Sequence, residues 1–338
     1  MVTAMVDRAQ RVLSGIQPSG QKHLGNYFGA IRQHIALQDE FPGECFYFIA
    51  DYHALNTVHD AAAMHESVLE LARTYLALGL DPDKALLFRQ SDVPEVTQLA
   101  WLLATVTGMG LLERAHAYKD KVAQGLQASV GLFTYPVLMA ADILIYQSSL
   151  VPVGKDQVQH VEMAQDMATH FNQSYSPGEP LLRRPEARLA ATAYVAGTDG
   201  RKMSSSYGNI IPLFEAGKPL RKRIGAIVTD STPLGQPLDP DKCNVLALLA
   251  LFCEPEERER VAGWYRTGQR DGQPFGYGHA KQLLSERIES RFAPARARRD
   301  ELLADPEQVE QVLRRSAERA RAEAQRTIQR CRCACGLS

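Results

Sequence analysis

Short apolar runs alternate with segments of helical periodicity over the first half of the chain. Residues 11–16, 44–53, 84–90 and 150–153 have the length and apolar content of buried strands. From Ala61 onward, apolar residues recur at helical spacing until a Gly- and Pro-containing turn ends the helix. Strands that alternate with helices predict an α/β fold, a doubly wound parallel sheet with helices on both faces.

The pattern changes towards the C-terminus. Further helices are predicted from Pro94, over residues 133–147, which are apolar on all sides and therefore buried, and over residues 156–171. Loops follow at 174–185 and 197–209, and beyond Pro212 the strand signals disappear. We therefore expect an α/β domain at 1–212 and a helical domain at 213–300. Residues 301–338 are expected to form a C-terminal helix that packs back onto the rest of the protein and ends in a disordered Cys-rich tail.

Composition narrows the class of protein. The chain has 338 residues and a net charge of -1, so nucleic acid would have to bind to local basic patches rather than to an overall positive field. No run of 18 apolar residues is present, which argues against a membrane span, and the first residues lack the apolar core of a secretory signal. Together with scattered cysteines, these features predict a cytoplasmic protein.

Three of the six cysteines, Cys331, Cys333 and Cys335, lie close together near the C-terminus. They could form a metal-binding or redox-active tail, or they could be incidental thiols at a frayed end. Spacing by two residues suits a tetrahedral metal site less well than the usual wider gap, and no histidine lies nearby. This favours incidental thiols.

The segment GIQPSGQKHLGN, residues 15–26, follows the first predicted strand. Pro18, Gly20 and Gly25 would let the backbone approach a ligand closely, and a helix begins near Asn26. Because the N-terminus of a helix attracts phosphate, His23 could donate a hydrogen bond to a phosphate there. An ordinary surface loop remains the alternative.

A second candidate segment is KMSSS, residues 202–206, in a loop flanked by glycines. Its lysine and hydroxyl groups could clamp a triphosphate as a moving lid. A solvated polar loop is the alternative, and neither segment is decisive alone.

Taken together, HLGN and KMSSS resemble the HIGH and KMSKS signatures of class I aminoacyl-tRNA synthetases in order and spacing. The segments SGIQPSG, TYPVLMAADIL, VPVGKDQ, RKRIGAIVTDS and SERIESRF are similar to bacterial tryptophanyl-tRNA synthetases, and the likeness covers almost the whole chain. This resemblance implies a Rossmann-like nucleotide-binding fold. It also implies a ligase that activates L-tryptophan with ATP and Mg²⁺, releases pyrophosphate, and transfers tryptophan to tRNA(Trp).

The resemblance assigns roles to residues on the ATP side. It gives no metal ligand among the protein side chains, so Mg²⁺ would come with ATP. The residues expected to bind ATP or to act in catalysis are Gln17, His23, Gly25, Asn26, Lys121, Gly154, Asp156, Lys202, Met203 and Ser204.

Two positions depart from the family pattern. Ser205 stands where the commoner signature has a second lysine, so one positive charge near the phosphates is missing, and Lys202 together with another cation such as Lys121 would have to balance more of the triphosphate charge. Lys155 stands where an acidic residue is frequent, which changes the electrostatics beside the ribose.

The tryptophan side calls for one acceptor in an apolar pocket, because the indole N–H is a lone donor. Asp142, inside an otherwise apolar helix, is the candidate acceptor, although it could be a carboxylate that merely caps or pairs. Tyr135 and Gln157 match family positions that bind the amino group. The expected apolar walls are Leu13, His53, Met139, Val151 and Val153.

Partners follow from the same resemblance. The helical part would bind the tRNA anticodon, with basic clusters at 218–223 and 291–299, and the family is usually a homodimer. Three alternatives stay open: a tyrosyl-tRNA synthetase, a smaller adenylyltransferase, and a non-catalytic paralogue that binds tryptophan or tRNA. A dinucleotide-binding dehydrogenase is disfavoured, because no GxGxxG follows the first strand.

Overall fold

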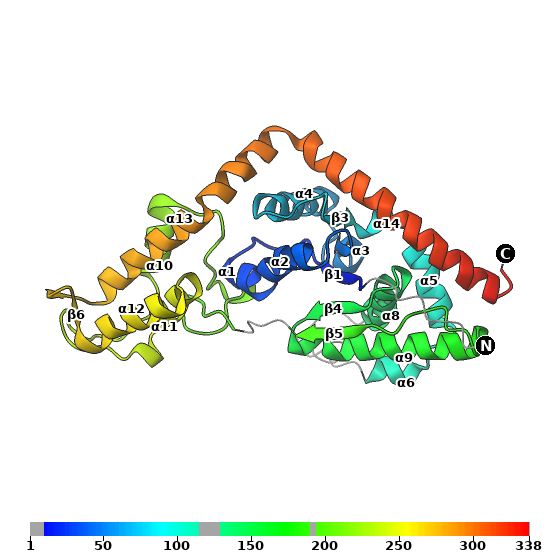
Figure 1. The fold of residues 1–338 in the computed structure, drawn as a ribbon, viewed down its shortest axis with the longest axis horizontal. Coiled ribbons are helices and arrows are strands. Elements are labelled where there is room, and N and C mark those ends of the chain that lie inside the picture. The colour runs from blue at the N-terminus through cyan, green and yellow to red at the C-terminus, as the bar shows by residue number, and fades with distance from the viewer. Residues whose placement is uncertain (1–9, 115–128, 190–193, 338) are drawn as a thin grey trace.

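A five-stranded parallel sheet forms the centre of the N-terminal part (Figure 1). The computed structural model describes residues 10–114, 129–189 and 194–337. The strands are β1 (Val12–Ile16), β2 (Cys45–Ile49), β3 (Ala85–Arg89), β4 (Leu150–Val153) and β5 (Glu186–Leu189), in the order β3-β2-β1-β4-β5. All neighbouring strands are parallel. The predicted doubly wound α/β fold is therefore confirmed.

Alternate residues of the central strands serve two different cores. Val12, Tyr47 and Leu87 point to one face, and Leu13 and Phe48 point to the other. The first face packs against α2 (Arg32–Glu40) and α4 (Ala61–Ala77), and the second against α5 (Glu95–Ala104), α8 (Val130–Ile145) and α9 (Val158–Tyr175). Burial on both faces explains why these strands read as continuous apolar runs in the sequence.

Two details of the first half differ from the sequence expectation. The strand predicted at 44–53 ends at Ile49, and α3 (Asp51–Ala54) begins directly after Ala50. The edge strand β5 was not predicted, because its residues are mostly exposed and carry no apolar alternation. The remaining short helices here are α1 (Leu24–Asn26), followed by a π-helical turn at Tyr27–Ile31, and α6 (Met109–Glu113).

Helices dominate the chain after residue 212, as predicted. They are α10 (Gly217–Gly225), α11 (Asn244–Leu249), α12 (Pro255–Thr267), α13 (Tyr277–Ala304) and α14 (Pro306–Ala334). The expectation that no strand occurs here is wrong in one small hairpin, where β6 (Gln269–Arg270) pairs with β7 (Gln273–Pro274). Figure 1 shows α13 and α14 as two long helices that meet above the sheet in an inverted V.

The predicted C-terminal helix, α14, packs back onto the sheet domain. Ala317, Ala320 and Ala324 lie in the core shared with β3 and α5. At the surface of this contact, Arg321 Nε donates to Glu95 Oε1 at 2.8 Å, and Arg89 pairs with Glu310. Small side chains on one face of α14 let it approach closely, and the flanking ion pairs fix its register.

The prediction that the last residues form a disordered Cys-rich tail is wrong. Helix α14 continues to Ala334, and Cys331 is fully buried in the core beneath it. Burial raises the pKa of the Cys331 thiol to about 12, so this thiol stays protonated. Cys331 therefore serves as a small apolar core residue. The tail is helical because the amphipathic pattern of α14 runs through the cysteines, a continuity that the CRCAC motif obscured.

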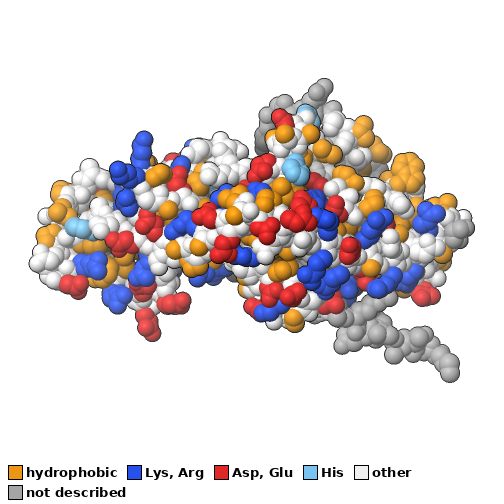
Figure 2. All heavy atoms as spheres, turned by 90° about the horizontal axis from the view of Figure 1, so that it is seen from above, with side chains coloured by type: hydrophobic (Ala, Val, Ile, Leu, Met, Phe, Trp, Pro, Cys, Tyr) orange, Lys and Arg blue, Asp and Glu red, His pale blue; other side chains and the backbone are white. Residues whose placement is uncertain are grey.

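Surface charge is mixed in sign. Figure 2 shows Lys and Arg side chains interspersed with Asp and Glu over the face that carries the two long helices. None of the helices in the described ranges is both long and apolar enough to cross a membrane.

A buried histidine joins three elements beneath the sheet. His34 on α2 lies 3.0 Å from the hydroxyl of Tyr75 on α4, and its carbonyl oxygen accepts from Tyr47 Oη on β2 at 2.8 Å. The His34 side chain is only 3% exposed, and this burial lowers its pKa from 6.5 to about 4. His34 is therefore neutral in the folded protein near pH 7.

This burial predicts a pH-dependent loss of stability. Unfolding exposes His34, which then binds a proton between pH 6.5 and about 4, whereas the folded form does not. The free energy of unfolding should therefore fall by up to about 3 kcal/mol from this residue as the pH drops through that window. Urea titrations of wild type and His34→Phe at pH 7.5, 6.0 and 5.0 should show a shallower pH slope in the variant. His170→Gln, on the exposed face of α9, should keep the wild-type slope.

Candidate active site

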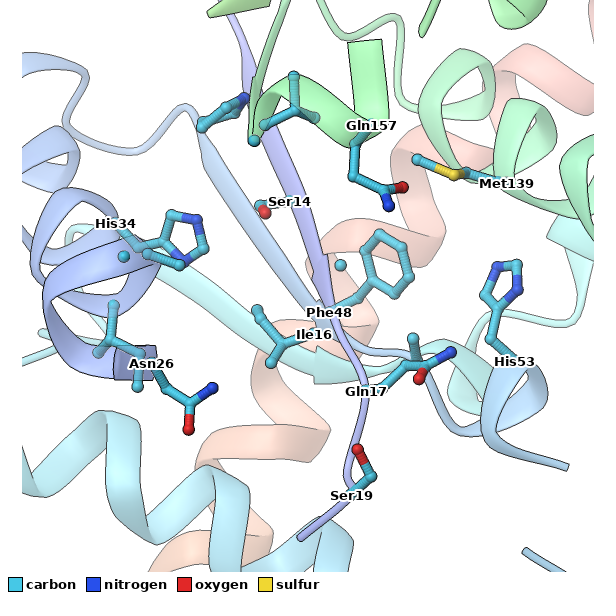
Figure 3. Close-up of a pocket in the computed structure, with 18 of the residues that line it drawn as sticks. Ser14, Ile16, Gln17, Ser19, Asn26, His34, Phe48, His53, Met139 and Gln157 are labelled. Carbon is cyan, nitrogen blue, oxygen red and sulfur yellow. The ribbon is translucent and has the colours of Figure 1, made fainter. Parts of the chain in front are cut away.

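A cavity of about 680 Å³ opens at the carboxyl ends of β1 and β4. The strand order reverses between these two strands, and in open α/β sheets ligands bind at such a switch point. Figure 3 shows that the cavity extends to both sides of β1. Asn26 and His34 lie on one side, and His53, Met139 and Gln157 lie on the other. One cavity can thus hold two chemically different groups across the end of one strand.

The HLGN turn forms the first wall. His23 is the N-cap of α1, and its backbone N–H donates to Asn26 Oδ1 at 3.0 Å. The chain at 211–213 lies alongside it, because Leu24 N–H donates to the Ile211 carbonyl and Leu213 N–H to the Lys22 carbonyl. The turn is therefore held in place by a segment far away in sequence.

The His23 ring is neutral at this site. It is 6% exposed, and its pKa is lowered to about 4, first by burial and then by the positive charge of Lys22. Its Nδ1 atom is buried and has no hydrogen-bond partner among the described residues. A neutral imidazole can donate from one nitrogen and accept with the other, so His23 can bind a ligand without carrying charge.

The two signature segments contact each other. The Gly25 N–H donates to Met203 Sδ at 3.4 Å, across 178 residues of sequence. A Cβ atom on Gly25 would lie 2.9 Å from the His23 ring and 3.4 Å from Met203 Cβ, so only glycine fits this position without displacement. The HLGN and KMSSS segments therefore lie against each other in the structure.

Asn209 organises the KMSSS loop and was missed by sequence reasoning. Its Oδ1 accepts from Ser204 N–H at 2.8 Å, and its Nδ2 donates to Asp199 Oδ1 at 2.7 Å and to the Lys202 carbonyl at 3.1 Å. The side chain is 2% exposed. These three side-chain hydrogen bonds add to a short backbone pairing of Ala196 with Lys202, and they leave no periodicity in the sequence.

The residues predicted to bind ATP or to act in catalysis differ in where they lie relative to the cavity. Those that line the cavity are Gln17, His23, Asn26, Gly154 and Ser204. Gly25 and Met203 lie directly behind this wall, and Lys202 is exposed on the loop away from it. Lys121 and the side chain of Asp156 lie outside the described residues, although the backbone places Asp156 in the turn Lys155–Gln157 after β4.

All residues predicted to bind tryptophan line the cavity. They are Leu13, His53, Tyr135, Met139, Asp142, Val151, Val153 and Gln157. Asp142 is 1% exposed, and burial raises the pKa of its carboxyl group, an effect that hydrogen bonds from His53 and Gln90 oppose. The carboxylate accepts from His53 Nε2 at 2.9 Å and from Gln90 Nε2 at 2.8 and 2.9 Å. Asp142 therefore both faces the cavity and is paired.

His53 has a different surrounding from the one predicted. It was expected as an apolar wall, but its Nε2 is a hydrogen-bond partner of Asp142, and its ring meets Tyr135 edge-on at 6.3 Å. The Tyr135 hydroxyl in turn lies 2.7 Å from His160 Nε2, and burial raises its pKa to about 12. Polar partners thus fix three aromatic or imidazole rings of this wall.

Several other lining or supporting residues were not predicted. Gln90 holds Asp142 from the 3₁₀ turn Gln90–Asp92 directly after β3, and β3 lies two strands away from β1, which leads into the turn with His23. Phe48 covers β1 so closely that a Cβ atom on Gly15 would lie 2.4 Å from its ring, which explains the glycine in SGIQPSG. Lys22 was not predicted either, although it could have been found from the sequence because it stands next to His23.

The fold and both signature loops are those of a nucleotide-dependent ligase class. The family model described as "tRNA synthetases class I (W and Y)" matches residues 5–293.

Individual relatives narrow this class. The chain is 53% identical over 327 residues to a tryptophan–tRNA ligase of Rhodopirellula baltica, covering 97% of this chain and 99% of the relative. It is 48% identical to the corresponding ligase of Fusobacterium nucleatum, over 97% of this chain and 98% of the relative. The chain belongs to the class I tRNA synthetases and, within them, to the bacterial tryptophan–tRNA ligases. The family predicted from the sequence is confirmed.

Solved structures of tRNA synthetases also align with this chain. Tryptophanyl-tRNA synthetase from Campylobacter jejuni complexed with ADP and tryptophan aligns with a TM-score of 0.89 and 46% identity, covering 97% of this chain and 100% of that one. A tyrosyl-tRNA synthetase from Archaeoglobus fulgidus aligns with a TM-score of 0.65 and 22% identity, over 86% of this chain and 90% of that one, which shows a shared fold alone.

The Asn209 network predicts a local change in dynamics. Asn209→Ala removes the acceptor of the Ser204 N–H and both donors to the loop, so the loop should open more often. Amide hydrogen exchange at Ser204 should become faster by on the order of tenfold or more. Ser206→Ala, at an exposed position of the same loop, should leave that rate unchanged. Equal exchange in wild type and Asn209→Ala would show that other contacts hold the loop.

Proposed function

We propose that this protein is a tryptophan–tRNA ligase that forms tryptophanyl-adenylate from L-tryptophan and ATP and then charges tRNA(Trp). The observation that carries this proposal is the single cavity that joins the HLGN turn and Ser204 to the buried carboxylate of Asp142. One end suits a nucleotide and the other suits an apolar side chain with one N–H donor. The tryptophan–tRNA ligases among its relatives support the same activity.

The chemistry needs no nucleophile from the protein. The tryptophan carboxylate attacks the α-phosphorus of ATP, a new P–O bond forms, and the bond to the leaving pyrophosphate breaks. The 3′-terminal adenosine hydroxyl of tRNA then attacks the carbonyl carbon and displaces AMP. Catalysis in the first step is positioning of two bound substrates plus stabilisation of the charge that accumulates on the phosphates.

On the ATP side, backbone and neutral groups would do most of the binding. His23, Asn26, Gln17 and Ser204 surround the phosphate end, and Gly154 and Asp156 would face the ribose. Lys202 would come to the phosphates when the KMSSS loop moves over ATP, and the family resemblance gives Lys121 the same partner.

Magnesium belongs to the nucleotide in this proposal. Besides the Lys22 ammonium, the described groups that line the phosphate end are amide, imidazole and hydroxyl groups, which suit a phosphate-bound ion that keeps its waters better than a protein cage of carboxylates. When bound, Mg²⁺ neutralises part of the phosphate charge.

On the tryptophan side, Asp142 would accept the indole N–H. Its Oδ2 accepts from both His53 and Gln90, whereas Oδ1 accepts from Gln90 alone, so Oδ1 keeps more capacity for a ligand donor. Tyr135 and Gln157 would bind the ammonium group. The indole ring would contact the remaining predicted wall residues, Leu13, Met139, Val151 and Val153.

We propose that the α/β part at 1–212 performs both chemical steps and that the helices at 213–300 bind the anticodon. Of the two basic clusters, the one on α10 is the better candidate, because Lys218 and Lys222 are exposed one turn apart. The second cluster is engaged within the chain, since Arg291 donates to Tyr27 Oη and Arg299 pairs with Glu70.

We also propose a homodimer in the cytoplasm. Trp101 on α5, Met109 on α6 and Val130 on α8 are 71%, 62% and 80% exposed, on helices that pack together. Large apolar side chains exposed on adjacent elements are typical of a protein interface. All six cysteines are free thiols, which suits a reducing compartment.

ATP–pyrophosphate exchange with each of the twenty amino acids tests the function directly. Exchange should occur with tryptophan. Asp142→Ala should lower kcat/KM for tryptophan by about 1,000-fold or more, because the pocket loses the acceptor that selects the indole N–H. Exchange with tyrosine instead would assign the sister activity, and tryptophan binding without any exchange would assign a non-catalytic binding protein.

A matched substrate comparison isolates the role of Asp142. The sulfur analogue of tryptophan, β-(3-benzothienyl)alanine, has no ring N–H, so wild type should reject it strongly and Asp142→Ala should not. If both proteins discriminate equally, Asp142 does not recognise the indole N–H.

The tRNA surface can be tested separately. The double variant Lys218→Glu with Lys222→Glu should weaken tRNA(Trp) binding at least tenfold at low salt and reduce the salt dependence of binding, because two phosphate contacts are lost. Pyrophosphate exchange should stay at the wild-type rate. Arg319→Glu, exposed on α14, is the control and should leave tRNA binding unchanged.

A further inference from the structure

The cavity contains little positive charge for a site that would hold a triphosphate. Of the described residues that line it, Lys22 is the only lysine or arginine. Lys202, the lysine of the KMSSS loop, is exposed and does not line the cavity. A site that stabilises accumulating phosphate charge needs fixed donors or cations at the phosphates. Lys22 is therefore the cation already in place.

The Lys22 side chain folds across the turn that leads from β1 to α1. Its Nζ donates to the Ser19 carbonyl at 2.6 Å and to the Gln17 carbonyl at 3.3 Å. An ammonium group has three donors, so two hold it on the turn and one remains for a ligand. The backbone is fixed as well, because the Lys22 carbonyl accepts from Leu213 N–H.

Ser205 approaches the same turn from the KMSSS loop. Its Oγ lies 3.4 Å from the position that a Cβ atom on Gly20 would occupy, and it also lines the cavity. Gly20 directly follows Ser19, whose carbonyl holds the Lys22 ammonium. A side chain at position 205 and the side chain of Lys22 therefore reach the same end of the cavity from two segments.

We propose that Lys22 is a catalytic residue that contacts the ATP phosphates and supplies the fixed positive charge that Ser205 does not. This assignment rests on the proposed function, and it adds a residue of the HLGN turn to the phosphate site. Burial lowers the pKa of Lys22 to about 8, and a bound phosphate would favour its protonated form. The positive charge of Lys22 also lowers the pKa of His23 and helps to keep it neutral. The site thus has one cation, Lys22, beside one neutral ring that can form hydrogen bonds, His23.

A purely structural role is the competing explanation, because Lys22 also ties the turn together. The two roles differ in ligand dependence. A phosphate contact matters for ATP and pyrophosphate but not for adenosine or tryptophan, whereas a loosened turn weakens all of these ligands and lowers the melting temperature.

The experiment compares wild type, Lys22→Met, Lys22→Arg and Lys22→Met with Ser205→Lys. Lys22→Met should lower kcat/KM for ATP in pyrophosphate exchange by about 100-fold, the usual effect of removing one charge-stabilising group. Lys22→Arg should retain most activity. The double variant should recover at least tenfold over Lys22→Met, because a lysine at 205 returns a cation to the same end of the cavity.

Direct binding keeps this test independent of turnover. By calorimetry, Lys22→Met should weaken Mg·ATP and Mg·pyrophosphate at least tenfold and leave adenosine and tryptophan within twofold of wild type. Lys84→Met, at an exposed ion pair with Asp39, is the surface control and should match wild type in every assay.

Three outcomes would overturn the proposal. They are equal weakening of all ligands, unchanged pyrophosphate binding, and no recovery in the double variant when that variant folds with the wild-type melting temperature. Failure of the proposed function is distinguishable, because then wild type itself would show no exchange with tryptophan, while the binding comparison would still decide whether Lys22 holds phosphate.

Discussion

The pairing of β1 with β2 on one side and β4 on the other is the constraint on which the site depends. Because all these strands are parallel, their carboxyl ends meet at one edge, and the turns that follow β1 and β4 open into the same cavity. The two sides of β1 then become two chemically different compartments, one beside α1 and α2 and the other beside α3 and α8 (Figure 3). A reaction between a nucleotide and an amino acid needs this geometry, since both must reach one point from different directions.

Buried polar groups are costly, and the protein satisfies them with side chains rather than with water-facing loops. Asp142 is held by His53 from α3 and Gln90 after β3, so its carboxylate is fixed before a ligand arrives. Asn209 does the same for the KMSSS loop through three hydrogen bonds. In both cases one buried side chain makes several of the hydrogen bonds that position a wall of the cavity.

The C-terminal helical part contacts the sheet domain in two places. The chain at 211–213 pairs with the HLGN turn, and α14 returns along β3 and α5 with Cys331 in the core. One apolar core runs from the sheet into α10, α11 and α13 without interruption. Helix α10 is therefore connected to the turn that carries His23 and Lys22 through continuous packing.

The sequence by itself determined β1 to β4 and the longer helices between them, the family, and the group of cavity-lining residues around Asp142. Local patterns and contiguous motifs carry that information, because buried parallel strands are continuously apolar and the motifs stand at strand ends. Tertiary structure alone decided that His53 partners Asp142, that Gln90 and Asn209 support the site, and that Lys22 rather than Lys202 lines the cavity. It also decided that Cys331 is buried, since α14 packs back onto the core of the sheet domain. The contacts of Asp142 join residues 52 and 89 positions apart, and no local pattern in one sequence records which distant side chains meet. The contacts of Asn209 span at most 10 positions, but they depend on the conformation of an irregular loop, which has no sequence period.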